Sequence, residues 1–239
     1  MKVQPNRLKE VAIHVLKGLN ATDEEAALVA EILVQADMRG TDTHGVHLLT
    51  LLPDRVEAGM IQIPTNLKVI KEGETTTLID GGNGLGQLAA HRAMMISIQK
   101  AKKFGVGCSL VRNTNNIGSL ISYTLMAAQE GMIGIVMANA AASMSPWGGT
   151  EAFFGTNPIS IAVPGGAEGP VVLDMSSSVV ARGKIRLAER TKEPIPLGWA
   201  IDEAGAPTTD PTAAMKGTLV PIGGPKGYGL ALIVDILAG

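Results

Sequence analysis

The sequence TTTLIDGGNGLGQLAAHRAMMISIQKAKKFGVGCSLV, residues 75–111, decides the fold. It opens with a β-rich run, Thr75 to Ile79, and closes with a second one, Val106 to Val111. Between them, Leu85 to Lys103 carries an Ala/Met/Ile face at helical spacing. Short β-rich runs predict strands, and the helical period between them predicts a helix. The stretch therefore predicts a strand–helix–strand unit, which is typical of an α/β protein.

The same alternation continues toward the C-terminus. Further strands are predicted over Ile133 to Ala138, Ile159 to Val163 and Val171 to Leu173, and helices over Gly118 to Gln129 and Gly227 to Leu237. Alternation of this kind indicates α/β layers around a largely buried sheet. We therefore predict an α/β fold over residues 73–239, with a layered mixed sheet and helices on both faces.

A helical region is predicted ahead of this sheet, over residues 1–72. Apolar residues repeat at helical spacing from Asn6 to Leu16, and Thr22-Asp23-Glu24-Glu25 has the pattern of a capping box. The helix that follows, to about Met38, is apolar on most faces, which indicates burial or a subunit contact. Another helix is predicted after Leu48, with Pro53 in its first turns or at a kink.

Composition excludes several classes of protein. The chain has 239 residues, of which 46% are hydrophobic and 18% charged, an ordinary globular balance. A net charge of −2 and 3% aromatic residues argue against nucleic-acid binding. No apolar stretch reaches the roughly 20 residues of a spanning helix, and the N-terminus does not resemble a signal peptide, so we expect a cytoplasmic protein. Cys108 is alone in an apolar run and is predicted to be a buried small residue.

The best candidate for proton chemistry is His44, in the stretch ADMRGTDTHGVH, residues 36–47. Thr43 precedes it, Gly45 follows it, and Asp42 lies two residues before it. Imidazole is the side chain whose ordinary pKa suits acid–base work near neutral pH. His44 and His47 are three residues apart, but no third ligand has suitable spacing, so no metal site is predicted.

A glycine pattern after the first strand has two interpretations. Gly84 to Ala89 has the form G-x-G-x-x-A, which can bring a pyrophosphate to a helix N-terminus. The acidic residue expected about 20 positions later is missing, and the next strand ends in Arg112-Asn113. A tight turn with close strand–helix packing is therefore the favoured interpretation. A Rossmann-type NADP enzyme that uses Arg112 for the 2′-phosphate stays as an alternative.

Five other polar or glycine-rich segments follow or adjoin predicted strands and helices. Each has an ordinary structural explanation, as a turn or a helix cap, beside a ligand-binding one. Ligands of α/β sheets collect beyond the carboxyl ends of strands, and a lysine at a glycine-rich helix start suits phosphate. The segments are Asn113 to Gly118, the loops Pro146 to Gly149 and Gly155 to Pro158, Asp174 to Ser178, and Gly223 to Gly229.

Together and in this order, these segments resemble the malate/L-lactate dehydrogenase family, which includes ureidoglycolate, sulfolactate and 2,3-diketogulonate oxidoreductases. The resemblance covers essentially the whole chain. The matching blocks are Ala36 to Gly40, Thr43 to Gly45, Gly86-Gln87, Arg112 to Thr114 with Gly118, Gly155 to Pro158, Asp174-Met175, Gly198 to Asp202, Pro207 to Pro211, and Gly223 to Gly227.

The resemblance implies transfer of a hydride between NAD or NADP and a small 2-hydroxy or 2-oxo acid. It also implies a homodimer and a cofactor fold that is not of the Rossmann type. His44 is similar to the family's proton donor or acceptor, and Thr43 and Asn116 to substrate-binding positions. The implied cofactor contacts are Gly155, Thr156, Asn157, Asp174, Met175, Ser176, Pro225 and Lys226. We expect His44 to face the nicotinamide ring across a cleft.

The sequence departs from the family's pattern in three ways. Asn116 stands where relatives often have a histidine, and Leu48 where they tend to have an arginine. An asparagine can orient a carbonyl but cannot shuttle a proton at neutral pH. The carboxylate could instead be held by Arg39, Arg55 or a residue of a partner subunit. Relatives also continue well past residue 239. A catalytically impaired relative that serves as a dimeric binding or scaffold protein is therefore the alternative function.

Overall fold

The computed structural model describes residues 3–239. They divide into two compact units. The first comprises the chain up to Gly134 together with Ala162–Val171, and the second comprises Ile135–Ile161 and Val172–Gly239. The helix that follows the second strand packs on both the N-terminal helices and the strands, so all of these belong to the first unit. The predicted division near residue 73 stays a prediction.

The N-terminal helices of the first unit form one hydrophobic core. α1 (Pro5–Gly18) packs on α2 (Asp23–Met38), and buried Leu16, Val29 and Leu33 lie between them and their neighbours. The predicted capping box is confirmed, because the Thr22 hydroxyl accepts from the Glu25 N–H and the Glu25 carboxylate accepts from the Thr22 N–H. After α2 the chain forms two 3₁₀ turns, Asp42–His44 and Val46–Leu51, and α3 (Leu52–Glu57).

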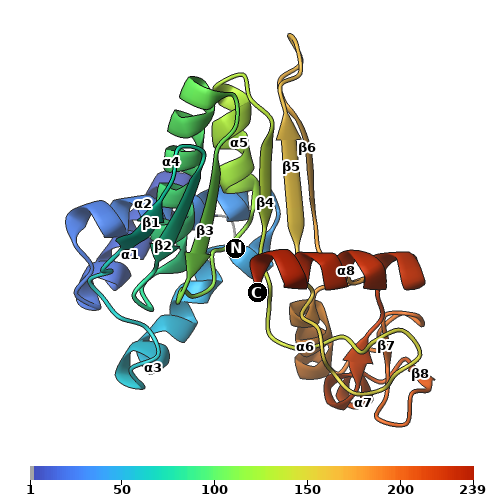
Figure 1. Ribbon diagram of the computed structural model, residues 1–239. Coiled ribbons are helices and arrows are strands. Elements are labelled where there is room, and N and C mark those ends of the chain that lie inside the picture. The colour runs from blue at the N-terminus through green and yellow to red at the C-terminus, as the bar shows by residue number, and fades with distance from the viewer. Residues whose placement is uncertain (1–2) are drawn as a thin grey trace. The chain divides into compact units, whose positions relative to one another are not determined.

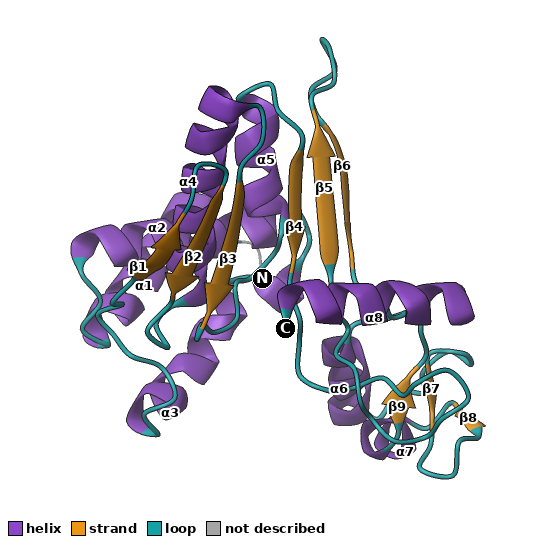
Figure 2. Cartoon of the chain, in the orientation of Figure 1, coloured by secondary structure: helices purple, strands orange, loops and turns teal. Residues whose placement is uncertain are grey.

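The strand–helix–strand prediction is confirmed (Figures 1 and 2). β2 (Thr76–Asp80) pairs in parallel with β3 (Cys108–Arg112) in the register Leu78 to Leu110, and α4 (Gly86–Phe104) crosses between them. β1 (Lys68–Glu72), which the sequence does not predict, pairs antiparallel with β2. α5 (Ile121–Gln129) packs beside α4 and begins three residues later than predicted.

One face of this first sheet is buried and the other is open. Ile79 and Val111 lie against α4, whereas Leu110 is 51% exposed. The prediction that Cys108 is buried is wrong: its thiol is exposed. The physical reason is strand alternation, which points Cys108 and Leu110 away from α4 and Ser109 and Val111 toward it.

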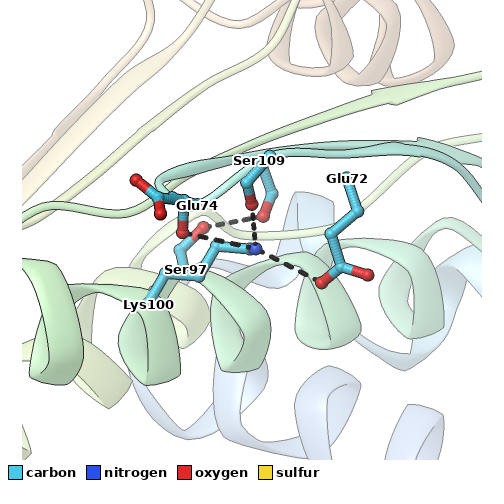
Figure 3. Close-up of polar contacts among 6 residues, drawn as sticks. Glu72, Glu74, Ser97, Lys100 and Ser109 are labelled. Atoms are coloured by element: carbon cyan, nitrogen blue, oxygen red, sulfur yellow. Dashed lines mark hydrogen bonds and ion pairs between the residues drawn. The ribbon is translucent and has the colours of Figure 1, made fainter.

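A lysine joins α4 to the turn between β1 and β2 (Figure 3). The Lys100 ammonium lies 3.2 Å from a Glu72 carboxylate oxygen and donates to the Gly73 carbonyl at 2.6 Å. Only 11% of its side chain is exposed. In the same view, the Ser97 hydroxyl donates to the Ser109 hydroxyl at 2.8 Å, which joins α4 to β3. These contacts fix the helix along the sheet.

The second unit holds the C-terminal elements. β4 (Gly134–Met137), β5 (Ile159–Val163) and β6 (Val171–Met175) form a three-stranded sheet, and the boundary between the units passes through all three strands. The remaining elements enclose a core that includes Met144, Ile185 and Ala231. They are α6 (Arg182–Thr191), β7 (Ala200–Ile201), β8 (Pro207–Thr208), α7 (Pro211–Lys216), β9 (Thr218–Leu219) and α8 (Pro225–Ala238). Within residues 3–239, no helix combines the length and apolarity that crossing a membrane requires.

Candidate active site

His44 lies at the end of a short turn that backbone hydrogen bonds fix to α2. The Thr41 N–H donates to the Ala36 carbonyl and the His44 N–H donates to the Thr41 carbonyl, both at 2.9 Å. The imidazole is partly buried, and its Nδ1 lies 2.9 Å from the Thr43 hydroxyl oxygen. Which of these two atoms donates depends on the tautomer. The hydroxyl of the neighbouring Thr43 therefore occupies Nδ1 of the His44 ring.

The Asp37 carboxylate clamps this turn from the last coil of α2. Its Oδ2 accepts from the Val46 N–H at 2.9 Å. A β-carbon on Gly45 would overlap the same carboxylate, so only glycine lets the turn approach it. Gly45 has φ −91° and ψ −156°, which any residue can adopt, so the requirement is one of space. Asp37 thus holds Gly45 and Val46, the two residues that directly follow His44.

The predicted substrate residue Asn116 lies on a loop that a buried tyrosine anchors. The Asn116 side-chain oxygen accepts from the Gly118 N–H at 2.8 Å, which leaves the NH2 end of its amide as a donor. The Tyr123 hydroxyl donates to the Ile117 carbonyl, and burial raises the pKa of this tyrosine. The loop is therefore held by an uncharged donor, and it keeps its shape over the neutral pH range.

The loop at Gly118 brings His44 and Gln87 together. A β-carbon on Gly118 would lie 3.9 Å from the His44 carbonyl oxygen and 3.9 Å from the Gln87 amide nitrogen. Gln87 is 6% exposed and lies in the first turn of α4. The first unit therefore holds the candidate acid–base residue, the predicted substrate asparagine and the buried Gln87 amide, to which the sequence pattern assigns no role.

A cavity of about 120 Å³ adjoins this group in the first unit. Its polar lining consists of Arg55, Gln87, Asn115 and Asn116. Most of the remaining lining is aliphatic and includes Leu48. Arg55, one of the cations considered for the substrate carboxylate, thus lines the cavity, whereas Arg39 is exposed and hydrogen-bonds to Gln35.

The G-x-G-x-x-A segment packs against the protein's own chain. A β-carbon on Gly84 would overlap the Thr65 side chain, and one on Gly86 would overlap the Asn115 carbonyl. Loop residues thus occupy the space beside both glycines, which supports the tight-turn interpretation. Arg112, the candidate for a 2′-phosphate, donates to Asp80 at 3.1 Å. The Gly82 N–H, followed by the Asn113 amide, lowers the pKa of Asp80.

In the second unit, Ser177 joins the three segments predicted to bind the cofactor. Its N–H and its hydroxyl both donate to the Thr156 carbonyl at 2.8 Å, and its carbonyl accepts from the Ile222 N–H at 2.9 Å. Ser177 itself directly follows the Asp174–Ser176 segment and is fully buried. Segments 155–157, 174–176 and 222–226 are therefore brought together by one residue, whose role depends on contacts distant in sequence.

Asn157 has a structural role in this unit. Its side-chain oxygen accepts from the Ala140 N–H at 3.0 Å, and its NH2 group donates to the Ala231 carbonyl at 2.9 Å and to an Asp235 carboxylate oxygen at 3.0 Å. The residue is fully buried with φ +30°. The Asn157 amide therefore ties the Gly155–Pro158 loop to α8. Its predicted contact with the cofactor stays a prediction.

The other predicted cofactor residues lie at the ends of β6 and α8. Asp174 is exposed, and Met175 and Ser176 are partly buried at the end of β6. Pro225 and the exposed Lys226 open α8, whose cap residue Gly224 has φ +65°. Unpaired N–H groups at a helix start and a lysine suit a phosphate, and a carboxylate beyond a strand suits a ribose hydroxyl. These residues fit a nicotinamide dinucleotide.

The chain belongs to the malate/L-lactate dehydrogenase family, which it matches over residues 3–239. It is 42% identical to the malate dehydrogenase of Pyrococcus horikoshii, over 100% of this chain and 68% of that protein. The solved structure of sulfolactate dehydrogenase from Methanocaldococcus jannaschii superimposes with a TM-score of 0.92 at 41% identity, over 99% of this chain and 69% of that one.

The names of two further relatives include a nicotinamide cofactor. The chain is 34% identical to the NAD⁺-dependent ureidoglycolate dehydrogenase of Escherichia coli O157:H7, over 100% of this chain and 68% of that protein. It is 35% identical to the NADP⁺-dependent (2R)-3-sulfolactate dehydrogenase of Chromohalobacter salexigens, over 95% of this chain and 68% of that protein. The predictions of the family, of an α/β fold and of a nicotinamide-dependent 2-hydroxy-acid dehydrogenase are confirmed.

Proposed function

We propose that this protein interconverts a 2-hydroxy acid and a 2-oxo acid with His44 as its general acid and base. The observation that carries the assignment is the Thr43–His44 contact in a turn clamped by Asp37, with the His44 carbonyl near Gly118 of the loop that holds Asn116. An imidazole suits both directions of the reaction because its ordinary pKa lies near neutral pH.

The roles of the neighbouring side chains follow from their hydrogen-bonding capacity. If the Thr43 hydroxyl accepts from Nδ1–H, the proton exchanged with the acid is carried on Nε2 of His44. His44 then donates this proton to the developing alkoxide during reduction and accepts it during oxidation. The Asn116 NH2 group donates a hydrogen bond to the carbonyl oxygen and stabilises the charge that develops there.

The second unit supplies the proposed cofactor site. The bound nicotinamide provides the hydride acceptor or donor, and the protein provides position and electrostatics. Lys226 and the N–H groups that open α8 would hold a phosphate, and Asp174 would accept from a ribose hydroxyl. Met175, Ser176, Gly155 and Thr156 would line the remainder of this site. Ser177 keeps these segments in place.

We also propose a cytoplasmic homodimer. Three apolar side chains of α8, Ile233, Ile236 and Leu237, are between 52% and 66% exposed, and a partner subunit would remove them from water. The exposed Cys108 thiol suits a reducing compartment. Light scattering on the purified protein tests the dimer, and a monomer at micromolar concentration would contradict it.

The decisive experiment compares His44→Ala with His47→Ala. His47 is the matched control because it lies three residues further along the same segment and is exposed. We expect His44→Ala to lower kcat by roughly 10²–10⁴-fold, the usual contribution of a general acid–base residue. The affinity for NADH and NADPH, measured by fluorescence quenching, should be unchanged in both variants. Equal turnover in the two variants would remove His44 from the mechanism.

The alternative is a relative that binds the cofactor or a partner without turnover. It is favoured by Asn116, which cannot titrate at neutral pH, and by Leu48, which cannot grip a carboxylate. A panel of 2-oxo acids with NADH and with NADPH separates the two functions. Quenching of cofactor fluorescence without oxidation of the cofactor by any acid would establish the alternative.

A further inference from the structure

The cavity lined by Gln87 and Asn116 has walls that would favour some acids over others. Its aliphatic wall comes from α2, the turn after His44, the start of α3 and the loop before α4, and it includes Val29, Leu33, Leu48, Leu51, Leu52 and Leu85. Among the described residues that line the cavity, Arg55 is the only one with a charged side chain. A 2-oxo acid with a second anionic group would have to bury that group against leucines without a counterion, which is unfavourable.

The size of the cavity suits a short side group. Its volume of about 120 Å³ is a little smaller than the apolar cavities of about 150 Å³ that hold benzene in other proteins. A whole acid of roughly four or five carbon atoms fills such a space, which leaves room for only a short side group. Leu48 and Leu49 follow the His44 turn directly along the chain, so the wall and the proposed acid–base residue belong to one segment.

Gln87 supplies the polar half of the same cavity. It is 94% buried and lines the cavity. Buried amides are nearly always hydrogen-bonded in folded proteins, and a partner for this one is therefore expected in the cavity. A β-carbon on Gly118 would lie 3.9 Å from the Gln87 nitrogen, so this donor is near the loop that holds Asn116.

We propose that this cavity binds a 2-oxo acid with one carboxylate and a short aliphatic side group, with Gln87 donating a hydrogen bond to it. Arg55 pairs with the carboxylate, Gln87 and Asn116 donate to the acid's oxygens, and the leucines enclose the side group. This inference rests on the proposed function, because only a dehydrogenase turns over the acids that test it. It narrows that function to a substrate class that differs from malate and sulfolactate, each of which carries two anionic groups.

The first test measures kcat/KM of the full chain with NADH and NADPH for 2-oxobutyrate, 2-oxoisovalerate and oxaloacetate. We expect the better aliphatic acid to exceed oxaloacetate by at least roughly tenfold, because oxaloacetate must desolvate a second carboxylate. A preference for oxaloacetate overturns the inference and leaves the dehydrogenase assignment in place. Turnover of no acid overturns both.

The second test changes the wall. Leu48→Arg should shift the ratio of kcat/KM for oxaloacetate to that for 2-oxobutyrate by at least roughly tenfold toward oxaloacetate, since it adds a counterion for the second carboxylate. Val11→Arg, which adds the same charge at an exposed position of α1 outside the cavity, should leave the ratio unchanged. An unchanged ratio in folded Leu48→Arg would show that the acid does not reach this wall.

The third test isolates the amide. Gln87→Leu should raise KM for 2-oxobutyrate roughly tenfold with unchanged cofactor affinity, because it removes one hydrogen bond to the acid. Gln87→Glu keeps the shape and should weaken binding further, since its carboxylate repels the substrate's. If Gln87 only packs, Gln87→Glu should lower thermal stability and leave KM unchanged. That result would show that Gln87 does not bind the acid.

Discussion

The Asp37 carboxylate fills the space that a β-carbon on Gly45 would need. The same carboxylate accepts a hydrogen bond from the Val46 N–H at 2.9 Å, so one side chain holds both residues that follow His44. The backbone angles of Gly45 are open to any residue. The glycine is therefore required by close packing, and the position of His44 depends on a contact that spans eight residues.

We expect Gly45→Ala to destabilise the protein by about 1–3 kcal/mol, because the new methyl group overlaps the Asp37 carboxylate. Gly18→Ala is the matched control. Gly18 ends α1 with open space around it, and alanine there should leave stability unchanged or raise it by up to about 1 kcal/mol. Denaturant unfolding followed by circular dichroism measures both. Equal stability of the two variants would contradict the packing argument.

Asp37→Ala should lower kcat more than it changes substrate KM or cofactor affinity, because it releases the turn that positions His44. A displacement of about 1 Å at a reacting group can cost roughly 10²-fold in rate. The double variant Asp37→Ala with Gly45→Ala adds a test of the contact itself. Since the carboxylate no longer meets the methyl group, its loss of stability should fall short of the sum of the single losses by about 1 kcal/mol. Strict additivity would argue that Asp37 and Gly45 do not interact.

Local sequence patterns account for much of the fold. The capping box at Thr22 and the strand–helix–strand run from residue 75 depend on neighbours in sequence, and both are confirmed. The sequence does not predict β1, because all five of its residues are exposed and polar and apolar side chains do not alternate along it. β7, β8 and β9 are two residues long, too short to leave a periodic pattern. Cys108 was misplaced because an apolar run does not reveal which face of its strand is covered.

The sequence likewise predicts only part of the candidate site. The motifs around His44, Asp174 and Lys226 can be recognised from adjacent residues. The contacts that hold them cannot, because Ser177 joins residues 156 and 222, and Gln87 and the His44 carbonyl both lie near Gly118. Each of these pairs depends on how distant segments pack. A sequence pattern therefore indicates which groups do chemistry, and the packing decides what orients them.

Lys100 should contribute to the stability of the first unit. Lys100→Met removes a mostly buried ammonium that pairs with Glu72 and donates to the Gly73 carbonyl, and it should cost about 1–3 kcal/mol. Lys102→Met removes an ion pair with Glu130 whose side chains are 53% and 49% exposed, and it should cost less than about 1 kcal/mol. Urea denaturation of both variants gives the comparison. A larger loss for Lys102→Met would contradict the ranking by burial.

His91 should make stability depend on pH. Burial lowers the pKa of His91 below its ordinary value of 6.5, so the unfolded chain takes up this proton before the folded protein does. The contribution of His91 is therefore complete above pH 6.5 and is lost as the pH falls through the lower pKa of the folded state. His91→Gln should flatten the decline of the unfolding free energy between pH 7 and about pH 5. A decline as steep as that of the wild type would show that His91 does not contribute to it.

Asn157 decides between a direct and an indirect role in binding the cofactor. Asn157→Ala removes three hydrogen bonds between the Gly155–Pro158 loop, Ala140 and α8, and it should cost about 2–4 kcal/mol because the partners lose their bonds inside the protein. Asn139→Ala is the control, since Asn139 is an exposed asparagine of the same unit. Denaturant unfolding measures both.

Asn157→Asp gives the sharper result. It places a carboxylate beside Asp235, 3.0 Å from the Asn157 nitrogen in the wild type, so the two negative charges repel. Protonation relieves this repulsion, and the gap in stability from the wild type should narrow as the pH falls toward about 4.

If Asn157 acts by anchoring α8, the affinity for NADH should fall in Asn157→Ala together with stability. A loss of affinity at full stability would instead place the Asn157 amide in direct contact with the cofactor.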